Sequence, residues 1–229
     1  MSPFMILIQE NAAGDSLTPS ETRKLLEARA AYEESLRSAS SYGEGERLRP
    51  PAEGRRVSRR DGVSRVPQEE PALAGYYLVD APDLEAAVEL ARCCPVAPGD
   101  ELEVRPVMKG APAPDRASER GRVFAFAVLG SAPDEQSFID VMDRIDASTD
   151  NRFPPGRFLG GVRLDAPGRG GRLARGGRAV FDGPFLESKE VIGGLFFMRA
   201  GSLDEAVEWA QGSGFVKHGV LEIRELWRS

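Results

Sequence analysis

The residue types best suited to chemistry gather in one short segment of the second half of the chain. The run Asp182-Gly183-Pro184-Phe185 is followed closely by Lys189. A partly desolvated carboxylate has a raised pKa that suits proton transfer, so Asp182 is the candidate general acid or base. Phe185 is then a candidate wall of a binding pocket, and Lys189 is a candidate contact for an anionic substrate.

The same segment has a structural interpretation that stays open. An Asp-Gly-Pro run is typical of a turn, in which Asp182 accepts backbone N–H bonds and Gly183 supplies an unusual dihedral angle. Phe185 would then fill the core. Lys189 would pair with Glu187 on a solvated edge strand, where an exposed ion pair contributes less than ~1 kcal/mol.

A second charged pair, Glu222 and Arg224, lies in the last strand-like segment of the chain, where it alternates with Leu221 and Ile223. Side chains alternate across a strand, so the charged pair should face away from the helices that Leu221 and Ile223 contact. Arg224 could grip a substrate carboxylate, with Glu222 beside it. The alternative is an ion pair between domains that fixes their register.

The chain contains the same weak pattern twice, at an offset of about 119 residues. Residues 75–79 match residues 194–198, and residues 102–105, which include Glu103 and Arg105, match residues 221–224. Only the second copy carries the Asp182 run. The repeat predicts a first domain at residues 1–110, a linker at 111–121 and a second domain at 122–229.

Each copy has the pattern of a β-α-β-β-α-β unit with an added hairpin strand. The first helix begins with Thr18, Pro19 and Glu21, which together make a capping box with proline at the first helical position. The strands at residues 76–79 and 195–198 are apolar on both faces and therefore need cover on both sides. We expect an α+β fold of two ferredoxin-like domains packed sheet to sheet as an intrachain pseudo-dimer, with a pocket between the sheets.

The block of residues 182–194 resembles the DGPF motif of the YCII-related family, supported by residues 202–210 and 104–107. The resemblance implies a dimeric α+β barrel of ferredoxin-like units. Most members of that family are of unknown activity, and a few relatives are small-molecule lyases or dehydrochlorinases that use a His-Asp pair. His218 lies just before the last strand, whereas the histidine of those relatives comes from the first half of the domain. The resemblance therefore does not carry their chemistry to this chain.

Composition limits the kinds of partner and cofactor that we expect for this protein. The net charge of −6 gives no global attraction to nucleic acid or to an anionic membrane. Apolar runs fall short of the roughly 20 residues that span a bilayer, so we expect a cytoplasmic protein. Two adjacent cysteines, Cys93 and Cys94, and a single histidine argue against a zinc site. The glycine spacing fits neither a dinucleotide nor a P-loop fingerprint, and we expect no cofactor.

Two functions remain. The first is the binding of a small polar or anionic organic molecule, which the same site could also convert without a cofactor. Its acid or base would be Asp182, and its binding residues would be Phe185, Lys189, Glu222 and Arg224. The second is a noncatalytic binding or regulatory module that meets a protein or a metabolite. Duplication already supplies both halves of a barrel, so a monomer is expected.

Overall fold

The computed structural model describes residues 1–10, 17–67, 72–111, 121–130, 134–148, 154–174, 178–181 and 191–227. Three of the candidate site residues, Asp182, Phe185 and Lys189, lie outside these residues. The roles assigned to them from the sequence remain predictions.

The first repeat forms a ferredoxin-like βαββαβ unit. Its antiparallel sheet has the strand order β2-β5-β1-β6, as expected for this topology. The elements are β1 (Ser2–Glu10), α1 (Pro19–Ser38), β2 (Tyr42–Arg47), β5 (Ala72–Ala81), α2 (Leu84–Arg92) and β6 (Glu101–Ala111).

The second repeat forms the same unit again. Its antiparallel sheet has the equivalent order, β8-β11-β7-β12. The elements are β7 (Arg122–Gly130), α3 (Glu135–Ser148), β8 (Phe158–Leu164), β11 (Val191–Ala200), α4 (Leu203–Gly212), η3 (Phe215–Lys217) and β12 (Val220–Glu225). The predicted α+β class with two ferredoxin-like units is thereby confirmed.

The two hairpins follow a course that the repeat pattern does not predict. The hairpin of the first repeat consists of η1 (Pro51–Glu53), β3 (Arg55–Ser58) and β4 (Gly62–Ser64), and β3 pairs with β12 of the second repeat. The hairpin of the second repeat consists of η2 (Pro167–Arg169), β9 (Gly171–Ala174) and β10 (Arg178–Phe181), and β9 pairs with β6 of the first repeat. Each repeat therefore contributes its hairpin to the sheet of the other repeat.

Two compact units result, and each contains a piece of both repeats. Unit 1 comprises Met1–Arg47, Gln68–Val107 and Gly168–Gly183. Unit 2 comprises Leu48–Pro67, Met108–Pro167 and Pro184–Ser229. The ranges 1–110 and 122–229 describe the repeats of the sequence, whereas the compact units interleave them.

Strand order explains why the first hairpin does not pair with β6 of its own repeat. The hairpin follows β2, which lies at one edge of that sheet, and β6 lies at the opposite edge. Adjacent strands are about 4.8 Å apart, so the chain would have to cross the sheet, a path of roughly 19 Å, to reach the outer side of β6. Pairing with β12 avoids that crossing.

Helix starts follow local capping chemistry. The Thr18 hydroxyl accepts a hydrogen bond from the Glu21 N–H at 3.3 Å, and the Thr18 N–H donates to the Glu21 carboxylate at 2.8 Å. This confirms the predicted capping box. The other helices also begin with a side-chain cap: Asp83 accepts from the Ala86 N–H at 2.9 Å in α2, Asp134 accepts from the Ser137 N–H at 2.7 Å in α3, and Ser202 accepts from the Glu205 N–H at 3.1 Å in α4.

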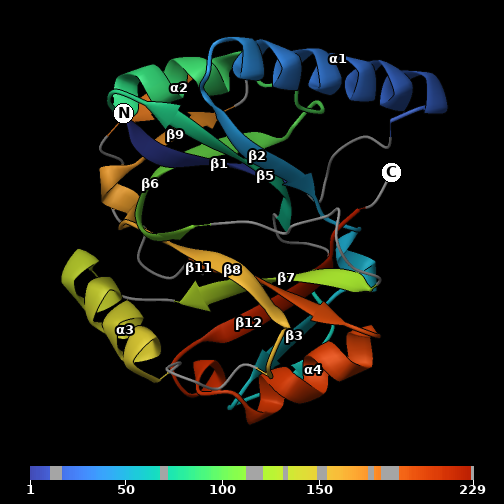
Figure 1. Ribbon diagram of the computed structural model, residues 1–229, viewed down its shortest axis with the longest axis vertical. Helices are drawn as coiled ribbons and strands as arrows, with labels where there is room; N and C mark the ends of the chain where they lie inside the picture. Colours follow the sequence, from blue (N-terminus) through green and yellow to red (C-terminus); the bar gives the residue numbers. More distant parts are fainter. Residues whose placement is uncertain are drawn as a thin grey trace. The chain divides into compact units, whose positions relative to one another are not determined.

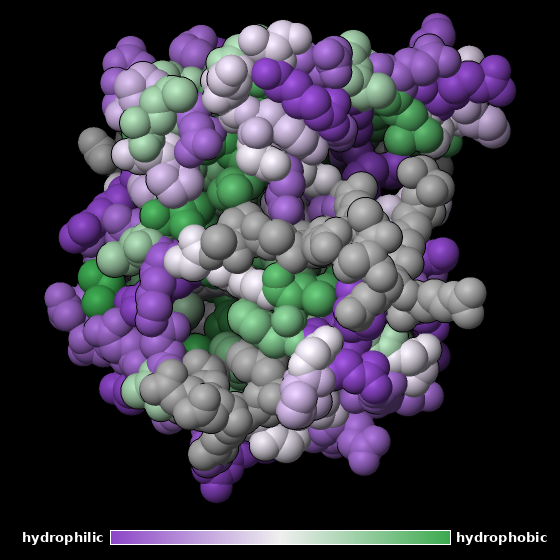
Figure 2. Space-filling view, in the orientation of Figure 1, coloured by the Kyte–Doolittle hydropathy of each residue, from purple (hydrophilic) through white to green (hydrophobic). Residues whose placement is uncertain are grey.

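Each unit has its own core between its helices and one face of its sheet. Figure 1 shows α1 and α2 on the same side of the unit 1 sheet, and α3 and α4 on the same side of the unit 2 sheet. The cores include the following residues: in unit 1, Ile6, Tyr32, Tyr77, Val79 and Val104; in unit 2, Phe126, Phe138, Phe196, Leu221 and Ile223. The outer surface over α1 is mainly hydrophilic (Figure 2), as an amphipathic covering helix requires.

The sheet faces opposite the helices are buried as well. The following residues on those faces are buried: Met5, Leu7 and Tyr76 in unit 1; Ala125, Ala127, Leu195 and Phe197 in unit 2. This confirms that the central strands need cover on both sides. Within the described part of the chain, no helix has the length and apolar character needed to cross a membrane.

Candidate functional site

The two sequence-predicted site residues that the structure describes, Glu222 and Arg224, lie on β12. They occupy the sheet face opposite the helices, because Leu221 and Ile223 point into the helix-covered core. Their relative exposures are 4% for Glu222 and 1% for Arg224. The predicted direction of the pair is confirmed, and both side chains are buried.

Glu222 contacts two guanidinium groups. Its Oε1 lies 3.1 Å from Nη1 of Arg224, and its Oε2 lies 3.0 Å from Nε of Arg56. Strand pairing creates this arrangement, since Glu222 of β12 stands directly opposite Arg56 of β3. Charge-assisted hydrogen bonds of this kind compensate for part of the cost of burying the three charges.

Arg224 also holds the chain segment that leads into the first hairpin. Its Nε donates a hydrogen bond to the carbonyl oxygen of Arg49 at 2.6 Å. A Cβ at Gly54 would lie 2.6 Å from Cδ of Arg224 and 3.0 Å from the carbonyl oxygen of Ile223. Glycine at position 54 therefore permits the close approach of this segment to β12.

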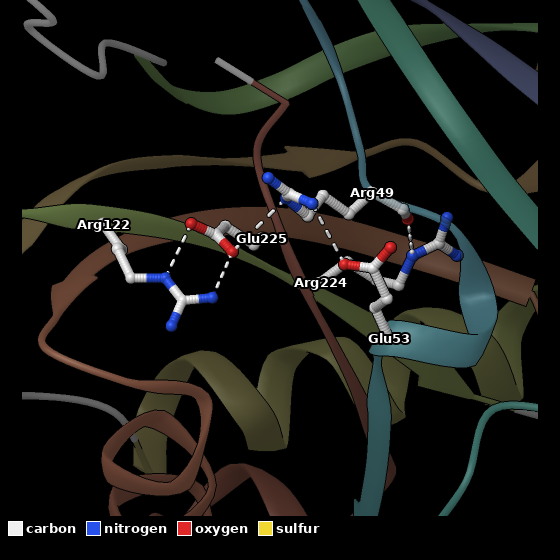
Figure 3. Close-up of polar contacts among 5 residues, drawn as sticks. All are labelled: Arg49, Glu53, Arg122, Arg224 and Glu225. Atoms are coloured by element: carbon white, nitrogen blue, oxygen red, sulfur yellow. Dashed lines mark hydrogen bonds and ion pairs between the residues drawn. The ribbon is translucent and has the colours of Figure 1, made fainter.

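A second, more exposed network lies beside Arg224 (Figure 3). The Glu225 carboxylate accepts a hydrogen bond from Nε of Arg122 at 2.7 Å and a second one from Nη2 of Arg122. It also lies 3.5 Å from Nε of Arg49. Arg49 reaches Glu53 at 3.2 Å. The hydrogen bond to Glu225 raises the pKa of Arg122 above its ordinary value. Such exposed pairs contribute little stability individually.

Unit 1 repeats the buried pair at the equivalent place. Nη1 of Arg105 lies 2.7 Å from Oε1 of Glu103, and Arg105 is 0% exposed. Gln9 donates to Oε2 of Glu103 at 3.3 Å, and Arg172 of β9 stands opposite Glu103 as Arg56 stands opposite Glu222. The two units thus share a Glu-x-Arg strand with a hairpin arginine in register.

The neighbouring strands differ between the units. In unit 1, Leu7 is opposite Glu103 and Met5 is opposite Arg105. In unit 2, the equivalent positions are Ala127 opposite Glu222 and Ala125 opposite Arg224. The pair in unit 2 therefore adjoins short side chains, whereas the pair in unit 1 adjoins long ones.

Sequence reasoning did not identify the roles of Arg49 and Arg56. The available signal was the common place of Arg56 and Arg172 in the two hairpins, 116 positions apart. That signal does not reveal which strand each hairpin joins, because strand pairing between distant segments leaves no local pattern.

The other titratable candidates do not form a catalytic group among the described residues. His218 is exposed at the end of η3. Both thiols are free, with Cys93 exposed and Cys94 buried. Burial raises the pKa of Cys94 to about 12, so its thiol stays protonated and unreactive near neutral pH. No group of three His, Cys, Asp or Glu side chains in the described ranges could hold a metal ion.

Comparison with solved structures gives distant likenesses that span the whole chain. A proposed chlorite dismutase has 11% identity and a TM-score of 0.42, covering 100% of this chain and 96% of that one. An anthrone oxidase-like protein has 15% identity and a TM-score of 0.45, covering 100% and 92%. A proposed monooxygenase from Fusobacterium nucleatum has 12% identity and a TM-score of 0.41, covering 98% and 91%. At these scores the likenesses carry no functional conclusion.

Comparison with protein families shows to which family the chain belongs. No curated protein matches the chain. The YCII-related domain matches residues 2–110 and 156–229, one segment in each repeat. The two segments agree with a tandem duplication, and together they cover most of the sequence. The chain belongs to the YCII-related domain family.

Proposed function

We propose that this protein binds a small organic anion on the face of the unit 2 sheet that carries Glu222 and Arg224, with Arg224 as the anion contact. The observation that carries the proposal is the difference between two otherwise equivalent Glu-Arg pairs. Only the pair in unit 2 adjoins short side chains, Ala125 and Ala127. A guanidinium group presents a planar fork that matches a carboxylate or a phosphate, so it is suited to such a ligand.

Glu222 has a positioning role in this proposal. It is bonded to Arg224 on its own strand and to Arg56 on β3. These contacts fix the guanidinium group of Arg224 before a ligand arrives, and preorganisation of this kind lowers the entropy cost of binding. Asp182, Phe185 and Lys189 are proposed, on the sequence alone, as the acid or base, the apolar wall and a further anion contact. In an enzyme, Asp182 would accept a proton from the ligand while Arg224 holds its anionic group.

A thermal-shift screen tests the binding proposal. Wild-type protein, Ala127→Leu and Leu7→Ala are heated with small carboxylates, phenols and phosphates. Ala127→Leu gives unit 2 the residue of unit 1, and Leu7→Ala makes the reverse change. A ligand should raise the Tm of wild type and of Leu7→Ala but not that of Ala127→Leu. Overpacking in the variant costs about 1–3 kcal/mol, so each variant is compared with its own ligand-free Tm.

Two results would contradict this proposal. One is a screen in which no compound raises the Tm of wild type. The other is a ligand that stabilises Ala127→Leu as much as wild type. Asp182→Asn separates binding from catalysis. If Asp182 is the acid or base, the variant should keep the ligand response and lose turnover. A turn-forming Asp182 instead costs roughly 1 kcal/mol or more of stability when it is replaced.

A second candidate function is a noncatalytic binding or regulatory module that meets a protein or a metabolite. The observation in its favour is that Arg224 and Glu222 already contact protein groups, namely the Arg49 carbonyl and Arg56. Contacts of that kind are what a purely structural pair requires. Under this alternative, Glu222→Gln lowers the free energy of unfolding, and the compounds of the screen have no effect on either protein.

A further inference from the structure

The first hairpin is bound to the second repeat by several kinds of contact at once. Val57 of β3 stands opposite Leu221 in the backbone ladder and is 1% exposed within the unit 2 core. Next to it, Arg56 makes the ion pair with Glu222. Beyond the ladder, the Arg59 N–H donates to the Val216 carbonyl at 3.1 Å. Backbone pairing, an apolar anchor and a charge pair together form a specific docking edge.

The connection before the hairpin continues the same interface. The Arg49 N–H donates to the Glu225 carbonyl at 2.8 Å, and Leu48 forms a β-bridge with Leu226. Both leucines are buried. The contact between the first repeat and β12 therefore runs from Leu48 through the hairpin.

The reverse contact has the same strand register and the same kind of apolar anchor. Leu173 of β9 stands opposite Leu102 of β6 and is 4% exposed within the unit 1 core. Arg172, one residue earlier, stands opposite Glu103. Each repeat thus offers an edge strand with a glutamate, and each receives a hairpin with an arginine in register.

We propose that this reciprocal hairpin exchange is a self-sufficient interface that holds the two repeats together without the covalent linker. An edge strand without its hairpin would expose unpaired backbone groups. It would also expose the apolar core residues that Val57 now covers. The partner that fits the edge of β12 is therefore the first repeat of this chain, through its arginine-bearing hairpin. Neither repeat completes a compact unit by itself.

The proposal is tested on the full chain, folded first and cleaved afterwards. A protease recognition sequence is inserted between Ala113 and Pro114, within the expected linker. After cleavage, the two fragments should elute together at about 1 μM, with the light-scattering mass of one 24.8 kDa chain plus the insert. Elution of two separate fragments would overturn the proposal.

Variants of the cleaved protein identify which contacts hold it together. Arg56→Glu places like charges opposite each other at Glu222, and Val57→Ala removes the apolar anchor. Each should raise the dissociation constant of the fragments at least tenfold. The control is Arg37→Glu, which breaks an exposed pair with Glu33 inside α1 of the first repeat. The Tm of each uncleaved variant is measured first, so that loss of folding is not mistaken for loss of association.

The hairpin variants also show whether the hairpin itself holds the fragments. If the fragments stay together and both hairpin variants behave like Arg37→Glu, contacts outside the hairpin hold the repeats, and the proposal is wrong. If Arg56→Glu releases the fragments, adding Glu222→Arg in the same protein should restore at least part of the lost affinity. Restoration is specific to a direct contact between these two side chains.

Discussion

Arg56 of the first repeat and Glu222 of the second repeat form an ion pair of 3.0 Å inside one compact unit. The two residues are 166 positions apart in the sequence. Their contact joins a hairpin of one repeat to the last strand of the other. The same carboxylate binds Arg224, so the position of a fully buried arginine of unit 2 depends on how the repeats are combined.

The buried pair of unit 1 should be costly to break from one side only. In Arg105→Met, Glu103 loses its guanidinium partner at 2.7 Å while its carboxylate remains largely buried. We expect a loss of about 3 kcal/mol in the free energy of unfolding, measured by urea denaturation. The double variant Glu103→Leu/Arg105→Met removes both charges and should recover most of that loss. A double variant as unstable as the single one would show that the apolar pair does not fit the site.

Unit 1 should lose stability in alkali because of a tyrosine and cysteine cluster. Tyr32 and Tyr77 pack edge to face at 5.3 Å, and Cys94 lies in the same core. Burial is the main cause that raises the pKa of all three groups, that of Cys94 from 9.0 to about 12. Above the ordinary pKa values the unfolded chain releases these protons while the folded protein keeps them. The free energy of unfolding therefore falls as the pH rises above about 9.

Tyr77→Phe tests the origin of that alkaline loss. Phe196 occupies the equivalent position in the second repeat, so the ring itself is compatible with the fold. Between pH 9 and pH 11 the variant should lose about 1 kcal/mol less stability than wild type, since one titrating group is gone. Urea midpoints at pH 8, 9, 10 and 11 measure the difference. Parallel curves for the two proteins would mean that Tyr77 does not titrate with unfolding.

Helix caps at matching positions of the two repeats should contribute similar amounts. Asp83 begins α2 and Ser202 begins α4, and each accepts a bond from the N–H three residues later. Replacing either by alanine should cost about 1 kcal/mol. Urea denaturation of Asp83→Ala and Ser202→Ala measures both values, with Ser38→Ala at the end of α1 as a control. A variant that matches the control would show that its cap bond contributes little.

Local chemistry made much of the fold predictable. Thr18 with Glu21 and the alternation of Leu221 and Ile223 with Glu222 and Arg224 depend only on neighbours in the sequence. They predicted a helix start and the face of a strand. The same kinds of local signal occur in both repeats, and they predicted the two βαββαβ units. What the sequence did not reveal is non-local, because the β3 hairpin has no feature that distinguishes β12 from β6 as its partner.

The candidate site was likewise predictable only in part. Glu222 and Arg224 were found from their spacing, whereas Arg49 and Arg56 join them through strand pairing between repeats. Asp182, Phe185 and Lys189 lie outside the described residues, so their roles stay predictions. The contrast of Ala125 and Ala127 with Met5 and Leu7 required the register of four strands, which periodicity alone cannot supply.

The approach of the first hairpin to β12 can be probed at a single glycine. In Gly54→Ala, the new methyl group would meet Cδ of Arg224 at 2.6 Å and the Ile223 carbonyl at 3.0 Å. The side chain of Arg224 can move only by weakening its bonds to Arg49 and Glu222, so we expect a loss of about 1–3 kcal/mol. Gly212→Ala is the matched control, because a Cβ there has no atom within 4 Å. Alanine near the end of α4 should be neutral or slightly stabilising by comparison. Equal urea midpoints for the two variants would mean that the segment can withdraw from β12 without cost, and Arg224 would then not be fixed by the hairpin of the first repeat.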